Sequence, residues 1–245
     1  MICAKAWPGH PTPTKDIMDT SNTIEVYCEI GKKRTFACAV DWPGWSRSGR
    51  DEDSALQALF DYGQRYARIL QAAQIDFQIP ADVSAFVVTE RLEGDASTDF
   101  GAPGAAPSYD KQPVDEAELV HFRRLLQAYW QAFDTAVQQA TGKELRKGPR
   151  GGGRDLDKIT EHVLGGDSSY LSRINWKFKE SSEETLNDGL VRCRQAVLEA
   201  LDTAVHEGIP ERGKRGGVNW TPRYFVRRSA WHLLDHLWEI EDRII

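Results

Sequence analysis

The spacing of apolar residues switches along this chain from that of strands to that of helices, which limits the folds it can adopt. Between residues 23 and 41, Ile24, Val26, Cys28 and Ile30 alternate with polar or outward residues. A period of two predicts a half-buried strand. Further along, apolar residues recur mainly every three or four positions, the period of an amphipathic helix. The fold class we predict is α+β followed by all-α.

The N-terminal region predicts a small α+β layer. A polar turn at residues 31–33 separates the first alternating run from a second one at Phe36, Cys38 and Val40, which predicts an antiparallel hairpin. We expect a short third strand around Trp45-Ser46. An amphipathic helix follows an acidic start at residues 51–73, and a last strand spans residues 84–92. The predicted order is β-β-(β)-α-β.

Four regions follow from this organisation. We predict an irregular or disordered start at residues 1–20 and the α+β domain at residues 21–93. Residues 94–113 are rich in Gly, Ala, Pro, Ser and Asp, which predicts a linker or surface loop. Residues 114–245 predict a four-helix bundle. Its four helical blocks are, roughly, residues 115–141, 155–174, 182–207 and 221–245.

Charge and hydropathy exclude several classes of partner. The net charge of -6 argues against sequence-independent binding of a phosphate backbone, so we expect no nucleic-acid partner. No apolar run approaches the roughly 20 residues that span a bilayer, and the start lacks the apolar stretch of a secretory signal. These features predict a cytoplasmic protein with no membrane partner.

The four cysteines form no CxxC pair and are too sparse for a disulfide framework, so they predict reduced thiols. Cys28 and Cys38 could face each other across the hairpin. The favoured interpretation is two small buried apolar residues without chemistry.

Three histidines form the candidate metal site. His232 and His236 lie four residues apart in the last helical block, which places both rings on one side of a helix. Taken alone, the pair is as consistent with two ordinary hydrogen-bonded histidines as with metal ligands. His162, on the inward stripe of the second block, supplies a third imidazole. Imidazole nitrogen suits divalent transition metals, so we predict one such ion, zinc first, with nickel or iron as alternatives.

The C-terminal half also resembles a known family. The segment around His162 resembles the second helix of the DinB-like superfamily, and residues 223–236 resemble its last helix. The resemblance spans about residues 114–245 and implies a four-helix bundle with His162, His232 and His236 as metal ligands. Known enzymes of that superfamily include low-molecular-weight thiol-dependent transferases and isomerases, while many members have no established activity.

The N-terminal region resembles the HicB-like small domain. The resemblance rests on the Pro-Gly turn at residues 42–46 and on the acidic helix start that follows it. HicB-like domains often serve as antitoxins. That role needs a toxin and a DNA-binding part, and the sequence has no recognisable helix-turn-helix.

The metal site leaves two functions open. Three protein ligands leave one coordination position free, which favours a metal-dependent enzyme, either a hydrolase or a thiol-dependent transferase. Asp235 and Glu239 lie on the ligand helix and are the candidate catalytic residues, although each also fits a solvated helix position. The alternative is a non-catalytic binding protein, in which the metal is structural and the HicB-like module contacts a protein partner.

Four arginines are candidates for substrate binding. Arg150 and Arg154 lie in a basic, glycine-rich stretch before the second helical block, and Arg223 and Arg227 lie at the start of the last one. Together they predict a site for the carboxylate or phosphate of a small-molecule substrate, either anionic or a thiol. A flexible basic linker is the alternative for the first pair. We also expect a homodimer, because bundles with exposed Trp and Leu often pair.

Overall fold

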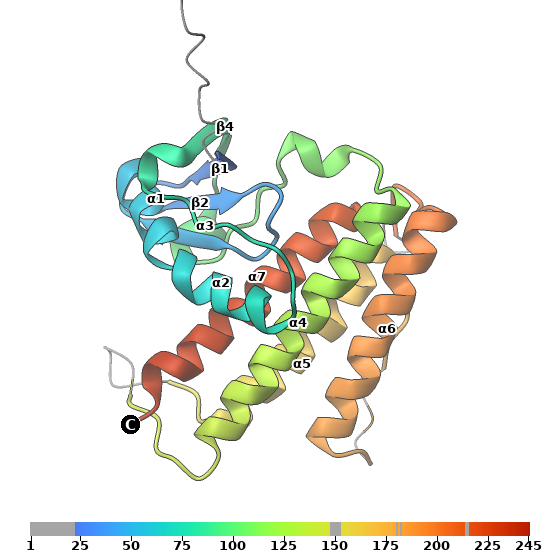
Figure 1. The fold of residues 1–245 in the computed structure, drawn as a ribbon. Helices are drawn as coiled ribbons and strands as arrows, with labels where there is room; N and C mark the ends of the chain where they lie inside the picture. Colours follow the sequence, from blue (N-terminus) through green and yellow to red (C-terminus); the bar gives the residue numbers. More distant parts are fainter. Residues whose placement is uncertain (1–22, 148–152, 180, 182, 214–215) are drawn as a thin grey trace, which may run out of the picture.

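The computed structural model describes residues 23–147, 153–179, 181, 183–213 and 216–245. Figure 1 shows a small sheet with short helices at one end of the molecule and long helices over the rest. The prediction of α+β followed by all-α is confirmed. The expected irregular start at residues 1–20 and the candidate Arg150 lie outside the described residues.

A four-stranded mixed sheet forms the N-terminal layer, in the order β3-β2-β1-β4. Strand β1 (Ile24–Ile30) pairs antiparallel with β2 (Thr35–Ala39), which pairs antiparallel with β3 (Ser46–Gly49). Strand β4 (Phe86–Glu93) pairs with β1 in parallel. A parallel pair needs a crossover, which the intervening helices provide. The predicted hairpin, short third strand and last strand are therefore confirmed.

The predicted helix at residues 51–73 is two helices, α1 (Glu52–Asp61) and α2 (Gly63–Ala72). Asp51 caps α1 by accepting a hydrogen bond from the Ser54 backbone N–H. The break lies at Tyr62, directly before a buried glycine, a residue that weakens a helix interior. The apolar period continues across the break, which is why the sequence pattern reads as one helix.

Both faces of the sheet are buried, so the prediction of half-buried strands is wrong for β2, in which every residue is buried. One face belongs to the main core with α1 and α2. The other face carries Tyr27, Phe36 and Cys38, and it packs against Trp231 of α7 (Pro222–Arg243). The Phe36 and Trp231 rings meet edge to face at 6.3 Å. A helix distant in sequence supplies this cover, which local alternation cannot reveal.

This two-sided burial also separates the cysteines. Tyr27 pairs with Cys38 and Cys28 with Ala37, so the two thiols lie on opposite faces of the sheet and cannot face each other. Burial raises the pKa of Cys28 to about 12 and that of Cys38 to about 11. Both are protonated structural residues at neutral pH.

Residues 94–113 carry more structure than a linker or surface loop. They include α3 (Ala96–Phe100) and the 3-10 turn η2 (Ser108–Lys111). The fully buried Glu29 side chain of β1 accepts hydrogen bonds from the backbone N–H groups of Gly104 and Ala105, each at 2.9 Å. These bonds attach the segment to the sheet.

The described part of the C-terminal region contains four long helices, as predicted. They are α4 (Glu116–Ala140), α5 (Leu156–Leu171, continued by the 3-10 turn η3, Ser172–Ile174), α6 (Leu186–His206) and α7. Each begins behind a side chain that caps its first turn: Asp115, Asp155, Thr185 and Thr221. Helix α7 packs against both α4 and α5, and α5 packs against α6.

Helix α7 also joins the bundle to the sheet (Figure 1). The buried Arg227 guanidinium donates to both Asp110 carboxylate oxygens, at 2.7 and 2.8 Å, and to the carbonyl oxygens of Ala39 and Val40. Tyr66 of α2 and Tyr129 of α4 share a hydrogen bond of 2.6 Å between their hydroxyls. The two layers therefore share one continuous core.

None of the described helices is long and apolar enough to cross a membrane. Among the described residues the exposed large apolar side chains include no Trp or Leu, so the premise for the expected homodimer is wrong. The exposed ones are Ile30, Val87, Phe100, Val120, Val191, Val218 and Ile245.

Candidate metal centre

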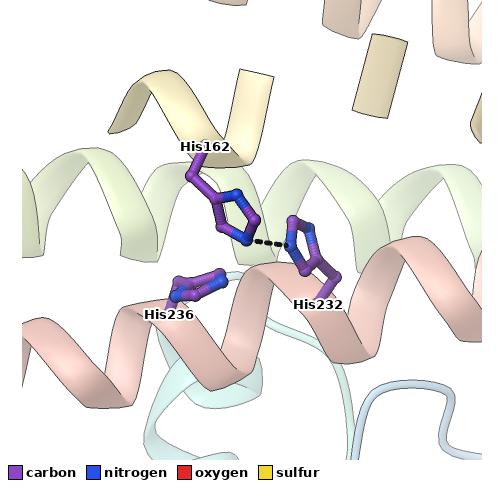
Figure 2. A group of neighbouring side chains, drawn as sticks. All are labelled: His162, His232 and His236. Carbon is purple, nitrogen blue, oxygen red and sulfur yellow. Dashed lines mark hydrogen bonds between the residues drawn. The ribbon is translucent and has the colours of Figure 1, made fainter. Parts of the chain in front are cut away.

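The three predicted histidines come together where α5 crosses α7. Figure 2 shows His162 projecting from α5 toward α7, and His232 and His236 projecting from α7 toward it. One ligand atom from each ring can be chosen so that all three lie within 4.8 Å of one another. His232 and His236 are 6% and 8% exposed, and His162 is more accessible. The three histidines are therefore close enough to hold one metal ion.

The spacing of the ring nitrogens suits a shared ion. The Nε2 atoms of His162 and His232 are 3.2 Å apart. Two imidazole nitrogens at about 2.0–2.1 Å from one tetrahedral zinc lie about 3.3 Å from each other. The Nδ1 atom of His236 is occupied by a carboxylate, which leaves its Nε2 as the ligand atom. The donor set and its spacing thus fit a divalent transition metal.

Burial keeps two of the imidazoles in the form that binds metal. The pKa of His232 is lowered to about 2, chiefly by burial and then by the neighbouring His236 and His162. The pKa of His162 is lowered chiefly by burial and then by His236. Metal ligands must be unprotonated, so protons compete weakly for these two rings at neutral pH.

Gly166 of α5 makes room for the His232 ring. A Cβ atom at position 166 would stand 2.4 Å from Cε1 of His232 and 2.8 Å from its Nδ1. Such distances are impossible, so any other residue would push the ring or the helix aside. The adjacent Gly165 has no atom within 4 Å of the corresponding position. The sequence analysis did not single out Gly166 as part of the candidate site, although a glycine inside a helical pattern often has a packing reason.

Glu239 orients His236. Its Oε2 lies 2.8 Å from His236 Nδ1, and its Oε1 accepts a 2.6 Å bond from Arg243 Nη1. The bond with His236 lowers the pKa of the Glu239 carboxyl, and Arg243 contributes to the same shift. A carboxylate on the far nitrogen fixes the ring and its tautomer, as in many metal sites. Glu239 therefore contacts the ring of a candidate ligand. Arg243, which holds Glu239, was not predicted from the sequence.

Asp235 has a different environment. Its Oδ1 lies 3.4 Å from Nη1 of Arg47 on β3, so the carboxylate faces the sheet layer. The Arg47 guanidinium also lies over the Tyr62 ring, at 3.8 Å. Asp235 is not part of the group of candidate metal ligands. The structure places it in a contact between the layers.

Two arginines of the predicted anion site, Arg223 and Arg227, are held by other groups of the chain. Arg223 is buried and bonds both carboxylate oxygens of Glu118, and Arg227 is committed to Asp110 and two carbonyls. Both guanidinium groups are thus engaged within the chain, as buried charges require, and no substrate-binding role is seen for them. Arg154 is exposed, and its charge lowers the pKa of both His162 and His232. It is the one described member of the four that remains at the metal centre.

Two other side chains border the histidines. The Tyr170 ring centroid lies 5.6 Å from that of His232. The Arg228 guanidinium lies 4.5 Å from the Trp231 ring centre and 5.7 Å from that of Tyr170, and it donates to the carbonyl oxygen of Pro103. The centre thus has an aromatic and cationic border on the His232 side.

Comparison with known proteins gives no relative. No protein-family model, curated protein or solved structure matches the chain significantly.

Proposed function

We propose that this protein is a DinB-like, divalent-metal-dependent enzyme, either a hydrolase or a low-molecular-weight thiol-dependent transferase. The observation that carries the proposal is the donor set, three imidazoles from two helices, which no fourth ligand joins among the residues that the structure describes. A metal held by three protein groups keeps a position for substrate. Two ligands on the last helix and one on the second are also the arrangement that the DinB-like resemblance implies.

The residues of the chain have defined parts in this proposal. His162, His232 and His236 bind the ion, and Glu239 holds the His236 ring in one orientation. Bound there, the metal would supply Lewis-acid chemistry and lower the pKa of a thiol or water that reaches it. The accessible side at His162 is where substrate enters, and Arg154 attracts an anionic group to that side.

Metal content is the first test. Purified untagged protein should carry about one divalent ion per chain by inductively coupled plasma mass spectrometry, with zinc expected first. The His232→Ala, His236→Ala double variant should lose it. The matched control is His206→Ala, because His206 is exposed and lies 2.6 Å from Glu116, away from the group. Wild-type protein that stays empty after reconstitution would overturn the proposal.

A structural metal is the competing function, and the burial of His232 and His236 favours it. In that case the ion only ties α5 to α7, and a partner protein is bound elsewhere. Cobalt substitution separates the two. For an open site, a small thiol such as 2-mercaptoethanol should change the visible spectrum of the cobalt protein, and thiol-transfer or hydrolysis screens become worthwhile. An unchanged spectrum would favour the structural role.

A further inference from the structure

A cleft of about 710 Å³ lies at the C-terminal end of α5. One wall is the chain that leaves α5, with Arg173, Trp176, Lys177, Phe178 and Lys179. The opposite wall comes from the connection between α6 and α7. Binding sites for small molecules commonly enclose about 300–1,000 Å³, so the cleft has a suitable size.

Charge is the first indication of its ligand. The described lining residues include three cationic side chains, Arg173, Lys177 and Lys179, and no Asp or Glu. No ion pair joins any of the three to a carboxylate in the part of the chain that the structure describes. Three cations in one hollow, none paired with a described carboxylate, favour an anionic ligand in a protein with net charge -6.

Aromatic rings lie between these cations. Burial alternates along the segment, so that Trp176 and Phe178 are half-buried while Lys177 and Lys179 are exposed. The Arg192 guanidinium lies 4.4 Å from the Phe178 ring centre and holds that ring from one side. The lining thus combines half-buried aromatic rings with exposed ammonium groups.

The opposite wall is already formed. Arg212 and Val218 make an antiparallel bridge, and the Gly213 N–H donates to the Gly217 carbonyl oxygen at 2.8 Å. The Asn219 N–H donates to the Glu211 carbonyl oxygen at 2.9 Å. Backbone bonds therefore close the base of this loop, and the cleft needs little ordering before it binds a ligand.

We propose that this cleft is a binding site for an aromatic anion, a small molecule that carries a phosphate or carboxylate on a flat ring system. The ring lies on Trp176 and Phe178, and Arg173, Lys177 and Lys179 hold the charge. The site is separate from the histidines. Ser168, which lines the cleft, is six residues beyond His162, about 9 Å along the axis of α5.

Isothermal titration calorimetry of the full chain tests the proposal. The probes are 1-naphthyl phosphate and 1-naphthoate, with 1-naphthol as the ring without charge and inorganic phosphate as the charge without a ring. At least one aromatic anion should bind with a Kd of about 1 mM or tighter. 1-Naphthol and inorganic phosphate should each bind at least about tenfold more weakly than that anion. The tighter of the two anions identifies the preferred charged group.

Two charge variants locate the binding. Lys177→Ala, Lys179→Ala should weaken the anion at least about tenfold. Lys32→Ala, Lys33→Ala removes the same charge from the exposed β1–β2 turn and should leave the affinity unchanged. Binding should also persist in the His232→Ala, His236→Ala variant, so failure of the metal proposal does not affect this one. No binding of either anion, or equal losses in the two lysine variants, would overturn the proposal.

Discussion

The His232 imidazole packs directly onto the α5 backbone at Gly166, where a Cβ would lie 2.4 Å from Cε1. Glycine in a helix interior costs about 1 kcal/mol relative to alanine. The same helix carries a second glycine, Gly165, beside open space. Neighbouring glycines with opposite surroundings offer a matched pair of substitutions.

Gly166→Ala should weaken metal binding about tenfold or more, because the new methyl group displaces the ring of a ligand. Gly165→Ala should leave metal affinity unchanged and stabilise the fold by about 0.5–1 kcal/mol. Competition titration with a chromophoric chelator measures the first effect, and thermal unfolding measures the second. Equal metal affinity in the two variants would contradict the placement of His232.

Glu239→Gln should weaken metal binding about 10–100-fold, because the amide keeps the shape of the side chain but loses the charge next to His236 Nδ1. Glu161→Gln is the control, since Glu161 is exposed and pairs with Lys158 at 2.6 Å. The same chelator competition gives both affinities. A normal affinity in Glu239→Gln would mean that the carboxylate has no part in holding the ring.

Arg227→Met should lower the free energy of unfolding by about 3–5 kcal/mol, because it leaves the buried Asp110 carboxylate without its cation. Urea denaturation followed by circular dichroism measures the loss. Arg91→Met breaks an exposed pair with Glu52 and should cost much less. Adding Asp110→Leu to Arg227→Met should recover part of the stability, and a further loss would contradict the pairing.

Asp167→Asn should change how stability depends on pH. Burial raises the pKa of the Asp167 carboxyl to about 7, with Arg194 of α6 opposing the shift. An unfolded aspartate has a pKa of about 3.9, so between these values the folded state keeps a proton that the unfolded state releases. Stability of the wild type should therefore fall as the pH rises from about 4 to about 7.

The Asn variant lacks this titration. It should match the wild type near pH 4 and exceed it above pH 7, by about 1.4 kcal/mol for each unit of the pKa shift. Urea unfolding across this pH range, with the exposed Asp76→Asn as control, measures the difference. Parallel pH profiles for wild type and Asp167→Asn would show that this carboxyl titrates normally.

Local patterns predicted the helices and the histidines well. Asp155 and Thr221 are capping residues at the starts of the helices that carry the ligands, and four-residue spacing places His232 and His236 on one side of α7. These features depend on residues within one or two helical turns, so the spacing of residues in the sequence is enough to predict them. The joining of His162 to the pair rested on an inward position; its ring does project toward α7, but it is more accessible than the other two.

Long-range partners could not be predicted in the same way. Arg227 is a cationic side chain of the kind that binds anionic substrates. Only the fold brings Asp110 and two backbone carbonyls to it. The second face of the sheet was expected to meet water because Trp231, which covers it, lies in a remote helix. Pairings of this kind need knowledge of which elements pack together.

The role of α7 as a wall shared by the sheet and the bundle has a consequence for the order of folding. Residues 23–93 emerge from the ribosome long before residues 222–243, yet the face with Tyr27 and Phe36 is only partly covered, by residues such as Ala102 and Tyr109, until Trp231 of α7 arrives. An apolar sheet face left uncovered invites aggregation. We therefore expect the two layers to complete their folding together, once the last helix has been made.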